Sequence, residues 1–415
     1  MTSANEQLEA GATGDFSPSA SPLAEASPTV AVVGGGPAGL MLSHLLARRG
    51  IDSVVIDIRT RHEIETTHRA GILEADTVRL LVDSGLDRVL RDGDEHEGIE
   101  LRFGGRNHRI HFRDLVVESV WLYPQTDVFI DLADARARAG GDVRFGVSDV
   151  EVSDVDSDTP LVTFTDSDGT PVRLSPRLVV GADGSRSRCR GLVPAATRRV
   201  YGAEYPFAWF GILAECPRAA DELVYCQSDR GFALLSQRTP TIQRMYLQCD
   251  PGMAPEQWSE ERVWEEFAAR LAGDDGFELQ TGPILERAVL GFRSFVQEPM
   301  HHGRLVLAGD AAHTVPPTGA KGLNLALADV RVLAECLETW LGSGDEGALV
   351  DYERRALRRV WRAQHFSWWM TQLLHTPGVD DPFSARRRLG ELDGVVGTPA
   401  GRAYLAEGYT GWPER

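Results

Sequence analysis

The chain has 415 residues, of which 42% are hydrophobic and 25% are charged, as is usual for a globular protein. Its formal net charge of −18 argues against nucleic acid and anionic membrane surfaces as partners, and an anionic substrate would need a local cluster of arginines. The five cysteines form no CxxC pair, and no apolar run approaches the roughly 20 residues of a membrane span. We therefore expect a cytoplasmic protein with reduced thiols and no metal site.

The N-terminal segment, residues 1–28, is rich in Ser, Ala, Pro and Glu, and the first basic residue of the chain is Arg48. A secretory signal needs a basic start and an apolar stretch, and this segment has neither. Its composition predicts a disordered tail.

A dinucleotide-binding pattern follows the tail. A β-branched run at 30–33 leads into Gly34, Gly36 and Gly39, a helical pattern comes next, and a second short strand ends at Asp57. The first glycine allows a tight turn, the second lets a pyrophosphate approach the backbone, and the third lets helix and strand pack closely. Asp57 lies about 20 residues further on, where an acid that binds a ribose hydroxyl is expected.

Two further glycine motifs come later in the chain. The stretch LVVGADG runs from an apolar strand into Asp183 and Gly184, and RLVLAGDAAH ends a strand at Asp310. A glycine-containing helix start follows, with Gly322 and Leu323, and its backbone N–H groups favour an anion. GxGxxG, GADG and GDAAH in this order resemble the FAD-dependent aromatic monooxygenases, so FAD is the expected cofactor.

The segments between these motifs have strand and hairpin signals, whereas the last third is helical. We expect an α/β fold in which a Rossmann-type FAD-binding domain is interleaved with a β-sheet substrate domain and followed by a helical C-terminal region that forms the interface of a homodimer. The expected ranges are 29–99, 126–189 and 291–345 for the FAD domain, 100–125 and 190–290 for the substrate domain, and 346–415 for the helical region.

Longer blocks are similar to one branch of this family, the 4-hydroxybenzoate 3-monooxygenases; among them are HRAGILE, HEGIEL, YPQTDV, RGFALLSQR, AGDAAHTVPPTGAKGLNLA and FSWWMT. The resemblance implies a flavin enzyme without a nicotinamide-binding domain. In such an enzyme NAD(P)H binds transiently to reduce the flavin, O₂ is the oxidant, and the substrate is a small aromatic carboxylate.

The expected substrate site lies on two strands. Ser236 and Arg238 are two residues apart and so point to the same face of a strand, and Tyr246 follows in the next strand. An arginine with two hydroxyls suits a carboxylate, and the resemblance places the benzoate carboxylate here. It also implies that Tyr225 binds the para hydroxyl and favours the phenolate, and that the Pro317 carbonyl lines the pocket.

The resemblance also assigns flavin contacts. Arg69, Gln125 and Asn324 match positions that touch the flavin, and Arg244 matches a residue involved in flavin movement. Lys321 is the only lysine in a chain with 42 arginines. Its compact ammonium can approach an anionic reduced flavin between small neighbours, which a bulkier guanidinium cannot.

A departure from the family concerns the substrate. Family enzymes have a second tyrosine that relays the phenolic proton, and the flanking stretch GELDGVVGT aligns Val395 with it. A shortened relay and the space beside the ring favour a substrate with a C3 donor, such as 3-amino-4-hydroxybenzoate, hydroxylated at C2 in slight preference to C5. The alternative is that water replaces the tyrosine and 4-hydroxybenzoate remains the substrate.

A second departure concerns the electron donor. The segment that reads the NADPH 2′-phosphate in family enzymes has Glu63, Glu65 and Thr67 here. Acidic residues repel a phosphate, so NADH is expected to be preferred over NADPH, although Arg59 and Arg61 could oppose this.

Overall fold

The computed structural model describes residues 23–67, 71–377 and 381–412. The nucleotide-binding part is built on a six-stranded sheet with the order β19-β20-β13-β2-β3-β9, in which all pairs except β19–β20 are parallel. Its strands are β2 (Val30–Val33), β3 (Ser53–Asp57), β9 (Asp142–Phe145), β13 (Leu178–Gly181), β19 (His301–His302) and β20 (Leu305–Leu307). The strands β2, β3 and β13 are buried over their whole length. Their valines belong to a core that also contains apolar side chains of helices and of the strand residues 161–174.

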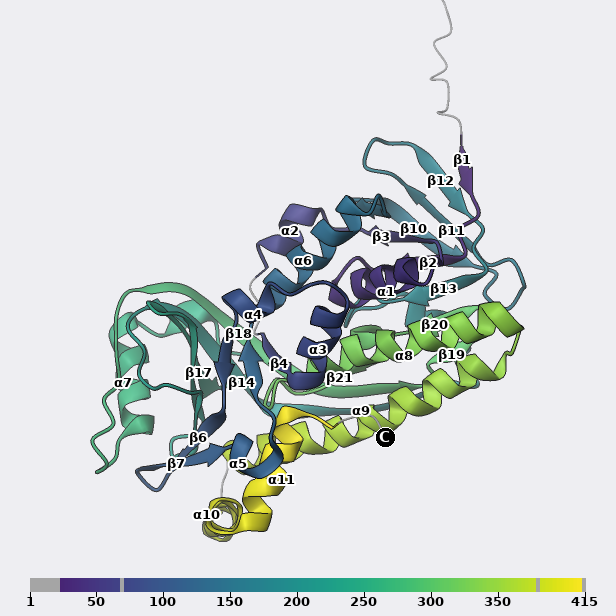
Figure 1. The fold of residues 1–415 in the computed structure, drawn as a ribbon. Helices are drawn as coiled ribbons and strands as arrows, with labels where there is room; N and C mark the ends of the chain where they lie inside the picture. The colour runs from purple at the N-terminus through teal and green to yellow at the C-terminus, as the bar shows by residue number, and fades with distance from the viewer. Residues whose placement is uncertain (1–22, 68–70, 378–380, 413–415) are drawn as a thin grey trace, which may run out of the picture.

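Helix α1 (Pro37–Arg48) lies against this sheet and packs between α6 (Gln125–Arg138) and α8 (Lys321–Ser343) (Figure 1). Three shorter helices follow the first βαβ unit: α2 (Arg61–Glu65), α3 (Ala75–Asp83) and α4 (Val89–Asp92). The apolar side of α1, formed mainly by leucines, joins the valines of β2 and β3 in one core. The start of α1 and the start of α8 are thereby held at one end of the sheet.

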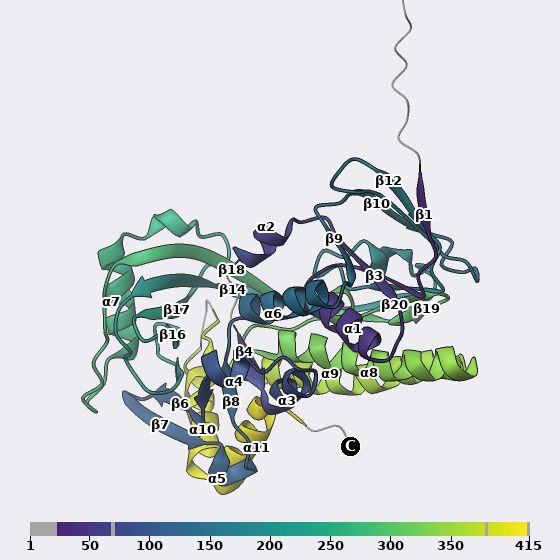
Figure 2. The ribbon, with the colours of Figure 1, turned by 45° about the horizontal axis from the view of Figure 1, so that its top comes forward.

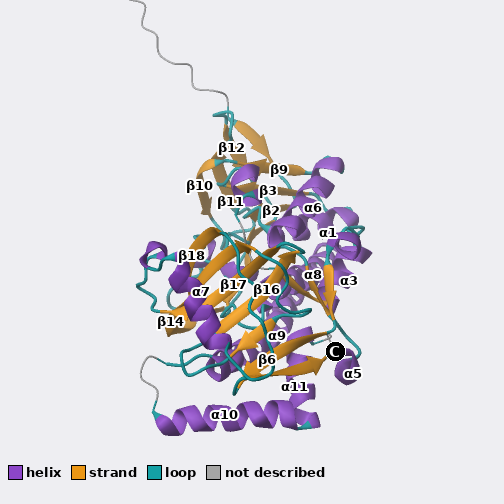
Figure 3. Cartoon of the chain, turned by 90° about the vertical axis from the view of Figure 1, so that its left-hand side faces the viewer, coloured by secondary structure: helices purple, strands orange, loops and turns teal. Residues whose placement is uncertain are grey.

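An eight-stranded sheet with the order β21-β18-β14-β17-β16-β15-β6-β7 forms the second part of the fold. Its strands are β6 (Gly98–Phe103), β7 (Arg106–His111), β14 (Arg199–Glu215), β15 (Val224–Cys226), β16 (Ala233–Thr239), β17 (Ile242–Cys249), β18 (Ile284–Glu298) and β21 (His313–Thr314). Helix α7 (Glu260–Leu271) covers one face, and the opposite face meets the C-terminal helices (Figure 3). The predicted domain boundary at residue 290 falls inside β18, because this strand pairs with β14 along almost its whole length.

Two small sheets complete the β structure. One has the order β1-β12-β11-β10, with β1 (Ala24–Ala26), β10 (Ser148–Ser153), β11 (Leu161–Thr165) and β12 (Pro171–Leu174). The other has the order β4-β8-β5, with β4 (Ile72–Glu74), β5 (Asp94–His96) and β8 (Val120–Leu122). The prediction of a disordered tail through residue 28 is wrong at its end, because β1 pairs with β12 through backbone hydrogen bonds that do not depend on side-chain type.

The C-terminal helices connect the two parts. Helix α9 (Gly347–Leu374) runs back along α8, and α10 (Pro382–Gly397) and α11 (Pro399–Thr410) then lie beside the eight-stranded sheet (Figures 1 and 2). Helix α11 packs against α5 (Arg113–Val116) and β7. The last described residues therefore return to the boundary between the two sheets. Among the described residues, no helix is long and apolar enough to cross a membrane, and no cluster of three metal-binding side chains is present.

Candidate active site

The turn after β2 has the geometry that the glycine pattern predicts. Gly34 has a φ of 114°, and a Cβ there would lie 2.2 Å from the carbonyl oxygen of Ala182. A Cβ on Gly39 would lie 1.9 Å from the carbonyl oxygen of Gly34, so only glycine lets α1 approach the turn. A Cβ on Gly36, in contrast, would meet nothing within 4 Å, which leaves room for a pyrophosphate at the N-terminus of α1.

Asp57 ends β3 beside this turn. Its Oδ2 accepts a hydrogen bond from the Gly35 N–H at 2.9 Å and another from the Arg59 guanidinium, also at 2.9 Å. The carboxylate is buried, and these bonds fix it at the end of the strand next to the glycine turn. The position is the one that an acid needs to reach a ribose, and the ribose contact itself stays a prediction.

One arginine joins the GADG motif to the GDAAH motif. Asp183 follows β13 and accepts a hydrogen bond from Ser187 Oγ at 2.5 Å, which shapes the turn at Gly184, where φ is 74°. The guanidinium of Arg190 donates to the carbonyl oxygens of Gly184 at 3.0 Å and Asp310 at 3.1 Å. The strand ends that carry the two predicted cofactor-binding acids are therefore tied together.

A buried pair, His313 and Asp329, fixes the GDAAH motif in place. Asp329 Oδ2 accepts from the Gly309 N–H at 3.0 Å and lies 2.6 Å from His313 Nε2. Burial disfavours the charged imidazole, but the Asp329 carboxylate outweighs it, so the pKa of His313 lies above its ordinary value. The GDAAH segment is thereby held against α8.

Lys321, the first residue of α8, is almost fully buried at 1% exposure. Its Nζ donates to Glu74 Oε1 at 2.7 Å and to the carbonyl oxygen of Tyr409 at 2.9 Å. The rings of Phe366 and Trp412 lie 5.2 and 5.5 Å from the ammonium, within the range of cation–π contacts. Burial lowers the pKa of Lys321, and the Glu74 carboxylate opposes that shift. The side chain thus has a fixed protein partner, and its effect on a reduced flavin stays a prediction.

The remaining residues at the start of α8 are held by strand β4. Asn324 Oδ1 accepts from the Glu74 N–H at 2.9 Å, and Asn324 Nδ2 donates to the Ile72 carbonyl at 2.9 Å. Gly322 has no neighbour within 4 Å of a Cβ position, and Leu323 is half-buried. The backbone at the start of this helix is therefore accessible to a ligand.

Two other predicted flavin contacts stay predictions. Gln125 is the first residue of α6 and is half-buried. Arg69 lies outside the described residues.

Three of the predicted substrate residues, Tyr225, Ser236 and Tyr246, share one face of the eight-stranded sheet. Tyr225 pairs with Leu234, Leu234 pairs with Tyr246, and Ser236 pairs with Arg244 across three adjacent strands. Directly opposed residues in antiparallel strands point to the same face, so all five side chains point to one face of the sheet. On that face Tyr225, Leu234 and Tyr246 pack with apolar residues of the C-terminal helices. The Tyr246 hydroxyl also accepts a hydrogen bond from Arg244 Nε at 2.9 Å.

Arg238 lies further along β16 and is half-buried. Burial lowers its pKa, the nearby Tyr246 raises it, and Arg244 lowers it further. A guanidinium stays protonated under these conditions. Arg238 and Arg244 provide the local positive charge that an anionic substrate needs in a chain with a net charge of −18.

Pro317 lies in the loop before α8, and its carbonyl oxygen accepts a hydrogen bond from the Ala320 N–H at 2.9 Å.

The Tyr225 hydroxyl forms a hydrogen bond of 2.7 Å with the Tyr409 hydroxyl. Both side chains are at most 1% exposed, and burial raises the pKa of Tyr225 and that of Tyr409. The backbone of Gly319, in the loop before Lys321, opposes part of that rise in the pKa of Tyr225. The two tyrosines therefore stay protonated at neutral pH, and each can donate and accept a hydrogen bond.

The interpretation of Val395 is consequently wrong. Val395 is a buried residue of α10 that packs in an apolar cluster with Leu392 and Leu405, whereas the second tyrosine is supplied by α11. A single residue separates the two helices, so the stretch that flanks Val395 does not show which helix supplies the tyrosine. The tyrosine itself is in the sequence GYTGW at 408–412. The sequence pattern did not predict this residue, nor did it predict that Glu74 pairs with Lys321.

Comparison with known proteins agrees with this geometry. A family profile described as "FAD binding domain" matches residues 27–367. The p-hydroxybenzoate hydroxylase of Acinetobacter baylyi is 42% identical over 386 residues, which cover 92% of this chain and 95% of that protein. The protoasukamycin 4-monooxygenase of Streptomyces nodosus subsp. asukaensis is 27% identical over 82% of this chain and 86% of that protein. A crystal structure of p-nitrophenol 4-monooxygenase from Pseudomonas putida shares the fold, with a TM-score of 0.73 at 20% identity over 92% of this chain and 97% of that one.

The chain belongs to the FAD-dependent aromatic monooxygenases, close to the 4-hydroxybenzoate hydroxylases. It is a flavin enzyme that hydroxylates aromatic rings. The open space at Gly36 and the accessible backbone at Gly322 fit an FAD held between the first turn and the start of α8.

Proposed function

We propose that this enzyme hydroxylates 4-hydroxybenzoate at C3, consuming NADH, a proton and O₂ and giving 3,4-dihydroxybenzoate, NAD⁺ and water. The observation that carries the proposal is the buried Tyr225–Tyr409 pair on the sheet face that also bears Ser236 and Tyr246. When bound, the flavin supplies the redox chemistry: hydride acceptance from the nicotinamide and activation of O₂. The protein residues supply orientation and proton transfer.

Arg238 is the proposed partner of the substrate carboxylate. Its charge is partly desolvated, and a carboxylate placed between Arg238, Ser236 and Tyr246 would receive charge-assisted hydrogen bonds. With the carboxylate fixed at one end, the para hydroxyl is directed away from the arginines. Tyr225 lies two strands from β17 on the same face, which suits contact with that hydroxyl.

The tyrosine pair is the proposed route for the phenolic proton. Because Tyr225 is neutral, it can accept a hydrogen bond from the substrate hydroxyl while it donates to Tyr409. Loss of the phenolic proton raises the electron density at the ring carbons ortho to the oxygen, which are the positions that an electrophilic oxygen attacks. This favours C3 of 4-hydroxybenzoate.

The same pair removes the argument for a C3-substituted substrate. That argument rested on a missing second tyrosine, and Tyr409 occupies that role in the proposed route. The relative from Acinetobacter baylyi, named for p-hydroxybenzoate, further supports the plain acid.

The test is to supply 4-hydroxybenzoate and 3-amino-4-hydroxybenzoate separately and to compare NADH consumed with product identified by NMR. We expect 3,4-dihydroxybenzoate in near-equal amount to NADH consumed. If 4-hydroxybenzoate stimulates NADH oxidation without product while the amino compound is hydroxylated at C2 or C5, the amino compound is the substrate.

We also propose that NADH is preferred over NADPH. Glu63 caps α2 by accepting from the Thr60 N–H at 2.7 Å, and Arg61 is paired with Glu65 at 2.7 Å. Arg59 is bound to the carboxylate of Asp57. Both arginines already have carboxylate partners, which weakens their attraction for a 2′-phosphate. Equal or better kcat/KM with NADPH would overturn this preference.

We propose a homodimer formed through the C-terminal helices. Trp361 and Trp368 lie seven residues apart on α9, are 42% and 48% exposed, and share one face of the helix, and Tyr404 of α11 is 47% exposed. Sedimentation analysis should give a dimer that Trp368→Glu weakens. A wild-type monomer at micromolar concentration would contradict the proposal.

A further inference from the structure

We propose that His375, at the C-terminal end of α9, is a positioning residue for the substrate carboxylate and acts through Trp209 and Tyr246. The inference rests on the proposed function, because it takes Tyr246 as a partner of that carboxylate. The Trp209 Nε1–H donates a hydrogen bond of 2.7 Å to His375 Nε2, and both side chains are buried. An indole N–H can only donate, so Nε2 of His375 is the acceptor and the ring proton is on Nδ1.

The other ring nitrogen ties the imidazole to its own helix. His375 Nδ1 lies 2.9 Å from the carbonyl oxygen of Thr371, to which the His375 backbone N–H also donates at 3.0 Å. Burial lowers the pKa of His375 to about 3, so the ring is neutral at neutral pH and keeps one donor and one acceptor. The imidazole also stacks on the rings of Phe207 and Phe232, with ring centres 4.6 and 4.3 Å apart. Its plane and its hydrogen bonds are therefore fixed.

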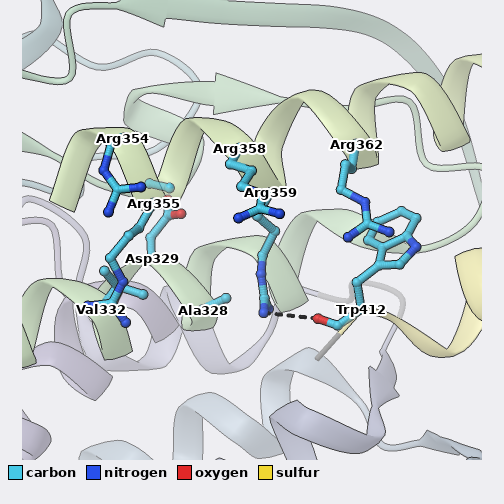
Figure 4. Close-up of a pocket in the computed structure, with 10 residues that line it drawn as sticks. Ala328, Asp329, Val332, Arg354, Arg355, Arg358, Arg359, Arg362 and Trp412 are labelled. Carbon is cyan, nitrogen blue, oxygen red and sulfur yellow. Dashed lines mark hydrogen bonds between the residues drawn. The ribbon is translucent and has the colours of Figure 1, made fainter. Parts of the chain in front are cut away.

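Helix α9, which carries this histidine, is anchored to other parts of the protein at two points. At its end, Gln248 Oε1 accepts from the Thr376 N–H at 3.1 Å, and Gln248 Nε2 donates to the Thr376 carbonyl oxygen. Gln248 is the residue of β17 directly opposite Trp209. Near the middle of the helix, Arg359 donates to the carbonyl oxygen of Trp412 at 3.1 Å (Figure 4). The helix is thereby bound both to the eight-stranded sheet and to the C-terminal segment.

The indole of Trp209 borders the ring of Tyr246, with the ring centres 4.8 Å apart. Both side chains lie on the same face of the sheet, because Gly211 is directly opposite Tyr246 and two residues from Trp209 on β14. A Cβ on Gly211 would lie 3.0 Å from two carbon atoms of the Tyr246 ring. The ring therefore lies over Gly211 and beside Trp209, so a shift of either neighbour would displace the Tyr246 hydroxyl.

The position of the Tyr246 hydroxyl decides how well it can bind a carboxylate. It accepts a hydrogen bond from Arg244 Nε at 2.9 Å, and a hydroxyl that accepts one bond can donate its proton to a carboxylate. Such a bond weakens when its distance or angle departs from the optimum. If Trp209 loses its partner on His375, its buried N–H is unsatisfied and the indole gains freedom to rotate. We therefore expect weaker binding of the carboxylate and little change at the tyrosine pair that takes the phenolic proton.

Calorimetric titration of the FAD-loaded enzyme with 4-hydroxybenzoate tests the positioning. His375→Phe keeps a flat ring in the stack and removes both nitrogens, so the dissociation constant should rise by about fivefold or more. In turnover this variant should raise KM by a similar factor and change kcat by less than about twofold. His375→Gln can still accept from the Trp209 N–H through its amide oxygen, so it should recover most of the affinity. No recovery would overturn the role of the hydrogen bond.

A double-mutant cycle separates positioning from a general loss of stability. Tyr246→Phe removes the hydroxyl and should weaken binding by about tenfold. Adding His375→Phe to it should change the dissociation constant by less than about twofold, because the hydroxyl through which His375 acts is already absent. An additive loss in the double variant would overturn the route through Tyr246.

Two further variants carry the test if His375→Phe does not hold FAD. Trp209→Phe removes the same hydrogen bond from its other end, and Gly211→Ala displaces the Tyr246 ring without touching the histidine. Both should weaken binding, and wild-type affinity in both would overturn the proposal. The matched control is His44→Phe on α1, which deletes a histidine bond of 2.9 Å to the Ser84 carbonyl oxygen and should leave the affinity within about twofold. Equal weakening in the control would also overturn the proposal.

The wild-type titration distinguishes failure of this inference from failure of the proposed function. A wild type that binds no 4-hydroxybenzoate, or a Tyr246→Phe variant that binds it normally, would overturn the proposed carboxylate site together with this inference. Binding that Tyr246→Phe weakens and His375→Phe leaves unchanged would overturn the role of His375 alone.

Discussion

Substituting Tyr409 with phenylalanine deletes one buried oxygen and tests the proton route directly. The Tyr409 ring stacks on Phe112 at 5.4 Å and meets Tyr225 edge-on at 6.0 Å, and phenylalanine keeps both contacts. The loss is one hydroxyl–hydroxyl hydrogen bond together with an unsatisfied Tyr225 hydroxyl, about 1–3 kcal/mol of unfolding free energy. The variant should therefore fold and bind FAD.

The effect on catalysis should be larger than the effect on stability. A positioned acid–base group contributes about 10²-fold or more, so kcat should fall by about that factor at neutral pH. Substrate affinity should change little, because Arg238 is untouched. The deficit should shrink as pH rises towards the phenolic pKa of the substrate, since the substrate then arrives already ionised.

The assay compares product formation with 4-hydroxybenzoate from acidic to alkaline pH, alongside urea unfolding of the FAD-loaded enzyme. Tyr404→Phe is the control: Tyr404 is on the same helix, and its exposed hydroxyl bonds to His365 at 2.9 Å. We expect this control to behave as wild type. A kcat for Tyr409→Phe within about threefold of wild type at neutral pH, or a deficit equal at every pH, would refute the proton route.

Four further outcomes are expected. Arg238→Ala should weaken substrate binding by about 3 kcal/mol or more, seen by titration; a near-normal KM would contradict the carboxylate role. Lys321→Met should lower the unfolding free energy by about 3–5 kcal/mol by stranding the Glu74 carboxylate, and Lys321→Met/Glu74→Gln should recover most of it in urea unfolding; no recovery would count against the ion pair. The pKa of His313 is raised in the folded state, so protonated His313 contributes stability that is complete below about pH 6.5 and is lost as pH rises through the pKa of the folded state. The unfolding free energies of wild type and His313→Gln should therefore converge at alkaline pH, and a constant gap would contradict this. Val395→Tyr should cost about 1–3 kcal/mol of stability by overpacking without changing the substrate ratio, and a changed ratio would place Val395 at the pocket.

The sequence alone was sufficient for the features that depend on local backbone geometry. The turn at Gly34 requires a positive φ and no side chain. At Gly39 a Cβ would lie only 1.9 Å from the carbonyl oxygen of Gly34, so this position also requires glycine. These requirements hold whatever the rest of the chain does, so the glycine spacing predicted the nucleotide-binding part of the fold. Strand alternation likewise explains why Ser236 points to the same face as Leu234, whereas Arg238 lies where the register of β16 with β17 shifts, which the sequence pattern does not show.

Only the tertiary structure decided which distant groups meet. Tyr225 and Tyr409 are 184 residues apart, and Lys321 and Glu74 are 247 apart. Val395 and Tyr409 are both buried on consecutive helices, and nothing local shows which helix points at Tyr225. That choice depends on how α10 and α11 pack against the sheet, where one buried hydroxyl finds a partner and avoids the cost of desolvation.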